Sequence, residues 1–93
     1  MSNDEAVKTV CIIPFSGKDK DWNRWSKTFL AIATTRQYKN ELVPPDNYVS
    51  IPMKNDLAYN DLLLSCQEEI IFGIIDEADG SAKEAWEGLK NKF

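Results

Sequence analysis

The chain has 93 residues, of which 43% are hydrophobic and 11% aromatic, which fits one small folded domain rather than a disordered tail. Its net charge of −4 argues against a dedicated nucleic-acid or membrane-surface binder, because such proteins are normally basic. The sequence contains no histidine, so the commonest general base and the commonest zinc ligand are both missing. We therefore expect a protein that is not an enzyme and that uses no metal or cofactor.

Cysteine content and the N-terminal sequence bear on the compartment. Cys11 and Cys66 are too few for a disulfide framework and form no C-x-x-C pair, which favours a reducing compartment. The first ten residues lack the apolar core of a signal peptide, and no apolar run approaches the ~18 residues of a membrane span. We expect an intracellular, cytoplasmic protein.

The N-terminal segment is predicted to be extended. Residues 1–5 look like a disordered lead, and a single domain is expected over residues 6–93. Residues 7–13 are mostly β-branched or apolar, and the proline that follows them favours extended backbone. The chain offers no strong strand to pair with this arm. It therefore either lies across its own helices or pairs with a second chain, which would place Val10 and Ile12 at an interface.

A first helix is predicted over residues 20–39. It follows a turn at Gly17, and two aspartates in its first turn suit the positive end of a helix. The prolines after Leu42 end the helical pattern, and residues 43–53 are expected to form a loop. One face of the helix is apolar and the other polar: the apolar face carries Trp22, Trp25, Phe29 and Ile32, and the polar face carries Asn23, Arg24, Lys27 and Thr34.

Two further helices are predicted over residues 55–64 and 66–77. Ser65 and Glu68 have the spacing of a capping box, which favours a break between them. Because this spacing also occurs inside helices, one kinked helix through both segments is the alternative. The second of these helices carries a broad apolar stripe that we expect to be buried: Ile70, Ile71, Ile74, Ile75 and Ala78.

Phe72 does not fit that stripe. It lies roughly 130° from the centre of the stripe at ~100° per residue. Phe72 is therefore the large apolar residue that the core explains least. It is either an intermolecular contact or part of a wider core face.

A last helix follows the turn at Gly80. Ser81 and Glu84 form a second capping-box pattern just after this glycine. The helix carries one apolar face, made of Ala82, Ala85, Trp86, Leu89 and Phe93. Together these elements predict an all-α fold, a small orthogonal bundle of about four helices with an extended N-terminal arm.

Two site patterns fail on inspection. The acidic run from Asp76 to Asp79 does not have the ligand spacing of a calcium loop, since Ile75 and Trp86 would occupy its first and last ligand positions. The tryptophans and cations of residues 22–27 resemble a single-strand nucleic-acid platform. The tryptophans share the helical stripe with Phe29, however, which favours a core role.

Two segments resemble the Gag polypeptide of copia-type LTR retrotransposons. Phe15-Ser16-Gly17 followed by Trp22-Asn23-Arg24-Trp25 is similar to the F-x-G turn and the aromatic start of the family's first capsid helix, with a slightly longer interval after Gly17. Residues 82–89 with Phe93 are similar to its A-x-E-A-W-x-x-L signature. The leucines of residues 62–64, followed by an acidic amphipathic helix, also fit. The resemblance covers residues 14–93.

The resemblance implies the all-α N-terminal lobe of a shell-forming structural protein. Without histidine the chain has no CCHC zinc knuckle, so RNA packaging and shell closure are not expected of this chain alone. The motif and core residues are Phe15, Gly17, Trp22, Trp25, Phe29, Ala82, Trp86, Leu89 and Phe93.

The distribution of charge points to a partner. Residues 18–39 carry a net charge of +4 and residues 65–79 a net charge of −5. If both surfaces reach solvent, Arg24 and Lys27 of one copy can meet Glu68 and Glu69 of another in a weak, salt-sensitive head-to-tail contact. Alternatively, the two faces lie against each other within one monomer, or are ordinary solvated surfaces.

We therefore expect self-association, with neither a membrane nor, through this domain alone, a nucleic acid as partner. The alternative function is that of a domesticated Gag-like adaptor lobe. Such a lobe would bind an extended peptide or partner protein, including another Gag chain, in a groove between helices.

Overall fold

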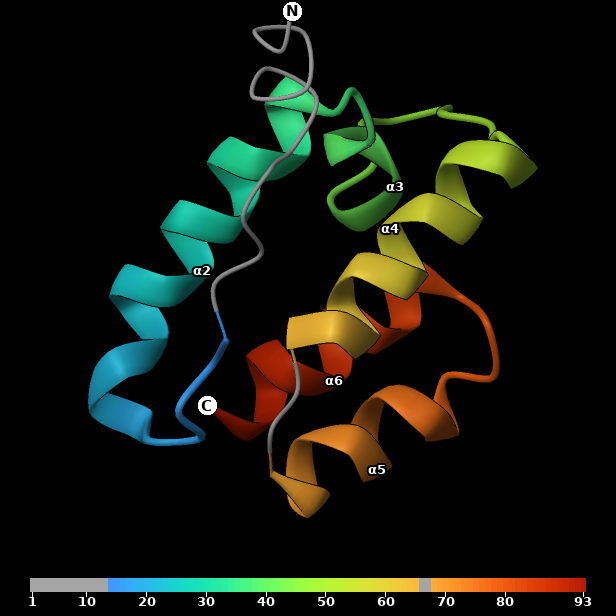
Figure 1. Cartoon of the computed structure of the whole chain (residues 1–93). Helices are drawn as coiled ribbons and strands as arrows, with labels where there is room; N and C mark the ends of the chain where they lie inside the picture. The colour runs from blue at the N-terminus through green and yellow to red at the C-terminus, as the bar shows by residue number, and fades with distance from the viewer. Residues whose placement is uncertain (1–13, 66–67) are drawn as a thin grey trace, which may run out of the picture.

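The structure, a computed structural model, describes residues 14–65 and 68–93. These residues form a small all-α bundle (Figure 1). The predicted arm at residues 7–13, with Val10 and Ile12, lies outside the described residues, as do both cysteines. The helices of the described part are α2 (Asp19–Thr35), α3 (Lys39–Leu42), α4 (Pro52–Ser65), α5 (Glu69–Glu77) and α6 (Ala82–Lys92).

The first predicted helix is shorter in the structure than predicted. Helix α2 ends at Thr35 rather than at residue 39, because Gln37 adopts a positive φ of 67°. The N–H of Tyr38 then donates to the carbonyl of Ala33 (2.9 Å), which is the bond that closes a Schellman motif. The chain turns there and continues as the short helix α3, which begins where the predicted helix ends and was not predicted.

The break between the two middle helices is confirmed, but the capping box predicted for it is wrong. Ser65 is the last residue of α4, and its hydroxyl donates back to the carbonyl of Leu62 (2.7 Å). Glu68 precedes α5 without a side-chain cap. The carbonyl of Ser65 instead accepts the N–H of Phe15 (3.0 Å), so the end of α4 is held by the segment that precedes α2.

The second capping box is in place at the start of α6. The N–H of Glu84 donates to the hydroxyl of Ser81 (3.2 Å), which satisfies one of the free donors of the first turn. A second side chain also caps this helix from a distance, since the N–H of Ala82 donates to the Asn55 side-chain carbonyl (2.9 Å). Asn55 thereby fixes the start of α6 against α4.

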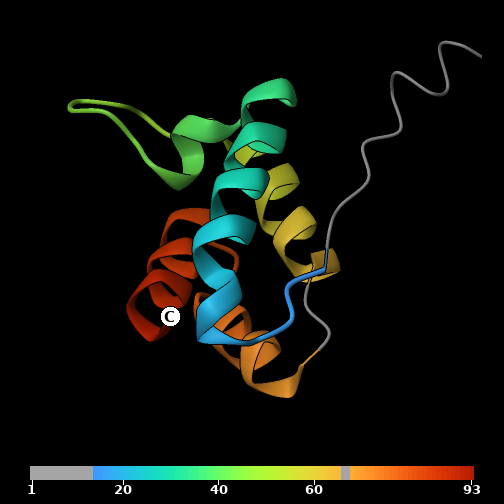
Figure 2. The ribbon, with the colours of Figure 1, turned by 90° about the vertical axis from the view of Figure 1, so that its left-hand side faces the viewer.

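The core has two halves. Helix α2 runs along one side of the molecule, with α4, α5 and α6 on the other (Figures 1 and 2). The aromatic half joins α2 to α6, and the aliphatic half fills the space between α4, α5 and α6. The rings of the aromatic half are Phe15, Trp22, Trp25, Phe29, Tyr38, Trp86 and Phe93; the aliphatic half contains Ala58, Leu62, Ile71, Ile75, Ala78, Ala82, Ala85 and Leu89; Ala33 and Leu42 are also buried in the cluster.

The apolar stripe of α5 is narrower than predicted. Ile71, Ile75 and Ala78 are buried and Ile74 is half-buried, but Ile70 is 51% exposed. At ~100° per residue, Ile70 lies roughly 100° around the helix from the buried Ile71. The prediction that Ile70 is buried is therefore wrong.

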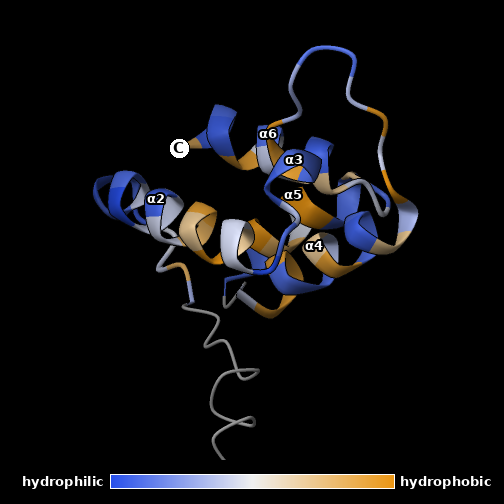
Figure 3. Cartoon of the chain, turned by 90° about the horizontal axis from the view of Figure 1, so that it is seen from above, coloured by the Kyte–Doolittle hydropathy of each residue, from blue (hydrophilic) through white to orange (hydrophobic). Residues whose placement is uncertain are grey.

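The segment between α3 and α4 stands away from the helices as an open loop, seen from two directions in Figures 2 and 3. Apolar residues recur along this loop and continue into the first turn of α4 (Figure 3). Val49 is 79% exposed and Met53 83% exposed. Since Pro52 and Met53 are helical, α4 begins earlier than the predicted residue 55; proline is well tolerated in a first turn.

Candidate functional site

A recess of about 460 Å³ opens beside the first half of α2. It is lined on one side by the segment before the helix and on the other by α2 itself. Phe15 and Trp25 are stacked with ring centroids 4.9 Å apart, and both belong to this lining. We call this recess the α2 groove; its lining residues are Pro14, Phe15, Ser16, Asp21, Arg24, Trp25 and Thr28.

Most polar side chains of the α2 groove already have partners within the chain. The hydroxyl of Ser16 donates to the Asp21 carboxylate (2.7 Å). The hydroxyl of Thr28 donates to the carbonyl of Arg24 (2.9 Å). The guanidinium of Arg24, in contrast, is exposed and forms no ion pair with any described residue. The groove therefore offers an apolar lining with one available positive charge at its edge.

The outer face of α5 combines carboxylates with an exposed aromatic ring. Phe72 is 51% exposed, so it lies outside the core. Glu69 and Asp76 are three residues before it and four after it, which places all three side chains on one face of the helix. A Cβ added at Gly73 would meet nothing within 4 Å, which shows that this face is open. We call this surface the α5 face.

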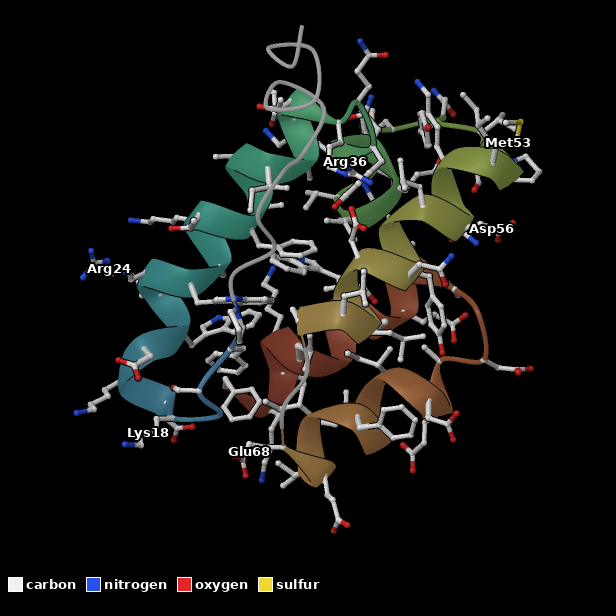
Figure 4. The ribbon with its side chains drawn as sticks, viewed as in Figure 1. Lys18, Arg24, Arg36, Met53, Asp56 and Glu68 are labelled. Atoms are coloured by element: carbon white, nitrogen blue, oxygen red, sulfur yellow. The ribbon has the colours of Figure 1, made fainter. Side chains whose placement is uncertain are left out.

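The cations of α2 and the carboxylates of α5 are exposed, and no ion pair joins them in the described part of the chain. Figure 4 shows Arg24 pointing away from the bundle on the α2 side, with Met53 and Asp56 on the far side. One carboxylate of the acidic segment lies close to the cationic helix. Glu68 lies beside the start of α2, because a Cβ added at Gly17 would be 3.2 Å from the Glu68 Cγ. The other α5 carboxylates follow as the helix leads away from α2 (Figure 1).

Arg36, which belongs to the net-positive segment of residues 18–39, has an internal role. The guanidinium of Arg36 donates to the buried carboxylate of Asp61 (2.7 Å), and the Tyr38 hydroxyl donates to the same oxygen (2.6 Å). Burial and the hydrogen bond to Asp61 raise the pKa of Tyr38. This cluster ties the α2–α3 turn to α4, so Arg36 does not contribute to a free cationic face.

A second buried carboxylate holds the projecting loop. Glu41 accepts hydrogen bonds from the Tyr48 hydroxyl (2.6 Å), the Ser50 hydroxyl (2.5 Å) and the Ile51 N–H (2.9 Å). Burial would raise the pKa of Glu41, but these hydrogen bonds and the nearby Lys54 outweigh it and hold the pKa below its usual value. The loop is thus anchored at its return half by one carboxylate.

The loop and α6 enclose a second recess. One part, of about 380 Å³, lies around the Glu41 anchor, and a smaller part of about 190 Å³ lies beside Trp86. Pro44 and Lys83 line both parts, so the two adjoin one another. We call this recess the loop groove.

The structure brings the two resemblance motifs together. Trp22 and Trp25 from the first motif lie 5.4 and 6.1 Å from Trp86 of the second, measured between ring centroids. Phe93 contacts Phe15 edge to face at 4.9 Å. Six of the nine motif residues are buried, while Trp22 and Phe93 are half-buried against them and Gly17, with φ 83°, forms the turn before α2. The buried six are Phe15, Trp25, Phe29, Ala82, Trp86 and Leu89.

The predicted interface residues are placed on the surface. Arg24, Lys27, Glu68 and Glu69 are all exposed. Sequence reasoning did not find the α2 groove, the loop groove or the two buried carboxylates. The sequence hinted at the burial of Glu41 and Asp61 only through their apolar neighbours along the chain. An exposed carboxylate next to apolar residues gives the same sequence pattern.

Two other kinds of site are absent from the described ranges. No cluster of histidine, cysteine or acidic side chains there has the arrangement to hold a metal ion. None of the helices there is both long and apolar enough to cross a membrane. Comparison of the chain with protein families, with curated proteins and with solved structures gave no match.

Proposed function

We propose that this chain is a self-association domain of the capsid type, as in the N-terminal lobe of copia-type Gag proteins, contributing to a shell or oligomer. The observation that carries this proposal is the pairing of two exposed, chemically complementary surfaces on one small bundle. The α2 groove is apolar with a positive edge, and the α5 face is apolar with negative edges.

The arrangement of the bundle supports the same proposal. The aromatic motif residues of the Gag resemblance form one ring cluster rather than a solvent-facing site. The chain also exposes several large apolar side chains on its surface. These side chains include Val49, Met53, Leu64, Ile70 and Phe72, of which Ile70 and Phe72 both belong to α5.

Sedimentation velocity of the purified chain tests this proposal. With no partner added, the average mass is expected to rise as protein concentration goes from micromolar to millimolar. The association should weaken as salt is raised, because screening shortens the range of charge interactions to ~10 Å at 0.1 M salt. A chain that remains monomeric over the whole range would overturn the proposal.

The alternative is an adaptor lobe that takes an extended peptide into the loop groove. That groove runs between a projecting loop and α6, and it has apolar walls at Pro44 and Trp86 beside polar groups around Glu41. An adaptor would bind its peptide as a monomer. Absence of association, together with saturable peptide binding that is lost in Trp86-proximal variants such as Pro44→Asp, would favour this function over the first.

A further inference from the structure

We propose that the α2 groove is the receptor for Phe72 of a second copy, with Arg24 pairing with the carboxylates that flank that ring. This inference rests on the proposed self-association and names the surfaces that carry it. The occupant is the α5 face of another copy of the same chain.

The chemistry of the groove defines what it accepts. Its hydroxyl groups and Asp21 are engaged with one another or with backbone, so a polar ligand would find few free partners there. The lining combines the exposed Pro14 with the edges of the buried rings of Phe15 and Trp25 at its base, and a volume of about 460 Å³ admits an aromatic ring. The guanidinium of Arg24 at the edge adds a preference for an anion beside that ring.

The α5 face supplies an aromatic ring with a carboxylate about one helical turn before it and another about one turn after it. Phe72 projects between Glu69 and Asp76, which share its face. When the ring enters the groove, one of these carboxylates comes within reach of Arg24. The remaining cations near the groove, Lys20 and Lys27, are exposed and extend the positive surface that the second carboxylate meets.

Two other exposed apolar side chains fit the groove less well. Val49 and Met53 are more exposed than Phe72, but their neighbourhood carries charges of both signs, Asp46, Lys54 and Asp56. A knob with mixed charges gains little from Arg24. A pocket that binds a hydrophobic knob located elsewhere on the same molecule links copies through two different surfaces.

Two variants, one for each surface, test the contact. Phe72→Ser removes the knob and Arg24→Glu reverses the charge of the groove. Both residues are exposed, so the melting temperature should barely change. Each variant alone is expected to weaken association about tenfold or more in sedimentation. The matched controls are Met53→Ser, an exposed apolar residue elsewhere, and Lys39→Glu, a charge reversal away from the groove; both should associate like the wild type.

Mixing the two variants is the decisive measurement. The Phe72→Ser chain keeps an intact groove and the Arg24→Glu chain keeps an intact knob, so an equimolar mixture can form one complete contact. The mixture should therefore form a heterodimer, detected by fluorescence anisotropy with one variant labelled, under conditions where each variant alone is monomeric.

The outcomes separate this inference from the proposed function. Wild type that does not associate overturns both. Wild type that associates while both variants associate equally well overturns only the groove contact, and would mean that another surface joins the copies. Variants that fail alone and are not restored by mixing also overturn it, because the two residues then do not meet across the contact.

Discussion

The two halves of the core hold their helices together by different means. In the aromatic half, α2 meets α6 through rings, with Trp86 at 5.4 Å from Trp22 and 5.7 Å from Phe29 between ring centroids. In the aliphatic half, α5 and α6 approach so closely that a Cβ at Gly88 would lie 2.8 Å from the Ile74 Cγ2. The aromatic half therefore depends on a few large side chains. The aliphatic half depends on small residues, such as Gly88, that let the two helices approach closely.

This difference predicts where each half is fragile. Rings span the space between α2 and its neighbours, so truncating one of them leaves a large void. Closely packed small residues leave little void when shortened but cannot accept added atoms. The aromatic half should be most sensitive to removal of atoms and the aliphatic half to their addition.

The largest expected effect is that of Trp86→Ala. Trp86 is 4% exposed and contacts three rings of α2. Its loss should lower the free energy of unfolding by ~3–5 kcal/mol, which can exceed half the stability of a domain this small. Urea denaturation followed by circular dichroism measures this loss. Glu87→Ala, the exposed neighbour on the same helix, is the control and should change stability by less than ~0.5 kcal/mol.

A loss below ~1 kcal/mol for Trp86→Ala would contradict the ring-dependent picture. It would mean that α2 is held in place by other contacts. The near-ultraviolet circular dichroism of the folded variant then becomes the informative observation, because it reports whether the remaining rings stay ordered.

The next effect concerns Glu41 of α3, the carboxylate that anchors the projecting loop. Glu41→Gln places an amide nitrogen among donors and leaves at least one hydrogen bond unmade, at a cost of ~1–3 kcal/mol. Urea denaturation near pH 7 measures this cost. Asp46→Asn, an exposed carboxylate in the same loop, should be neutral and serves as the control.

The pH dependence of this anchor follows from the lowered pKa of Glu41. A carboxyl group whose pKa is lower in the folded state stabilises that state fully above its unfolded-state value, which is about 4.5. This contribution is lost as the pH falls through the lower folded-state pKa. The stability difference between the wild type and Glu41→Gln should therefore narrow below pH 4.5. A difference that stays constant down to acid unfolding would show that the charge of Glu41 is not what anchors the loop.

The same contrast explains which features the sequence revealed. Trp22, Trp25 and Phe29 repeat at helical spacing, and large side chains at that spacing have few other places to go, so the aromatic half was predictable. Ile70 continued the same kind of pattern on α5 but is exposed. How wide a buried face is depends on which neighbours pack against it, and the sequence of one helix does not contain that information.

Helix ends and polar anchors were harder to predict for related reasons. The end of α2 rests on Gln37 in a left-handed conformation, a role in which glycine would have been recognisable. Asp61 receives its donors from residues 23 and 25 positions away, so its burial is a product of the fold. The break after Ser65 was predicted from a capping box that does not form. The position of the break was therefore predicted correctly, but the reason given for it was wrong.

A smaller effect is expected where the aliphatic half has no room. Gly88→Ala gains up to ~1 kcal/mol of helix propensity but forces a methyl group against Ile74, at a cost of ~1–3 kcal/mol. We expect a net loss of about 1 kcal/mol. A double-mutant cycle checks the cause, because in an Ile74→Ala background the same substitution should become neutral or stabilising. An equal loss in both backgrounds would place the conflict elsewhere.

The smallest effect is a gain in stability, and it is expected on the side of α5 that faces away from α6. Gly73 lies within α5, where an added Cβ would have nothing within 4 Å, and its φ is not positive. Gly73→Ala should therefore stabilise the chain by ~0.4–1 kcal/mol, mainly by reducing the conformational entropy of the unfolded state. Thermal denaturation of Gly73→Ala and Gly88→Ala side by side measures the contrast directly, since the chemical change is identical and only the space differs. Stability changes of opposite sign would show that α5 is closely packed on its α6 side and open on its Phe72 side. A loss of stability at both positions would mean that the α5 face is not open. The contact proposed for Phe72 would then lose its structural basis.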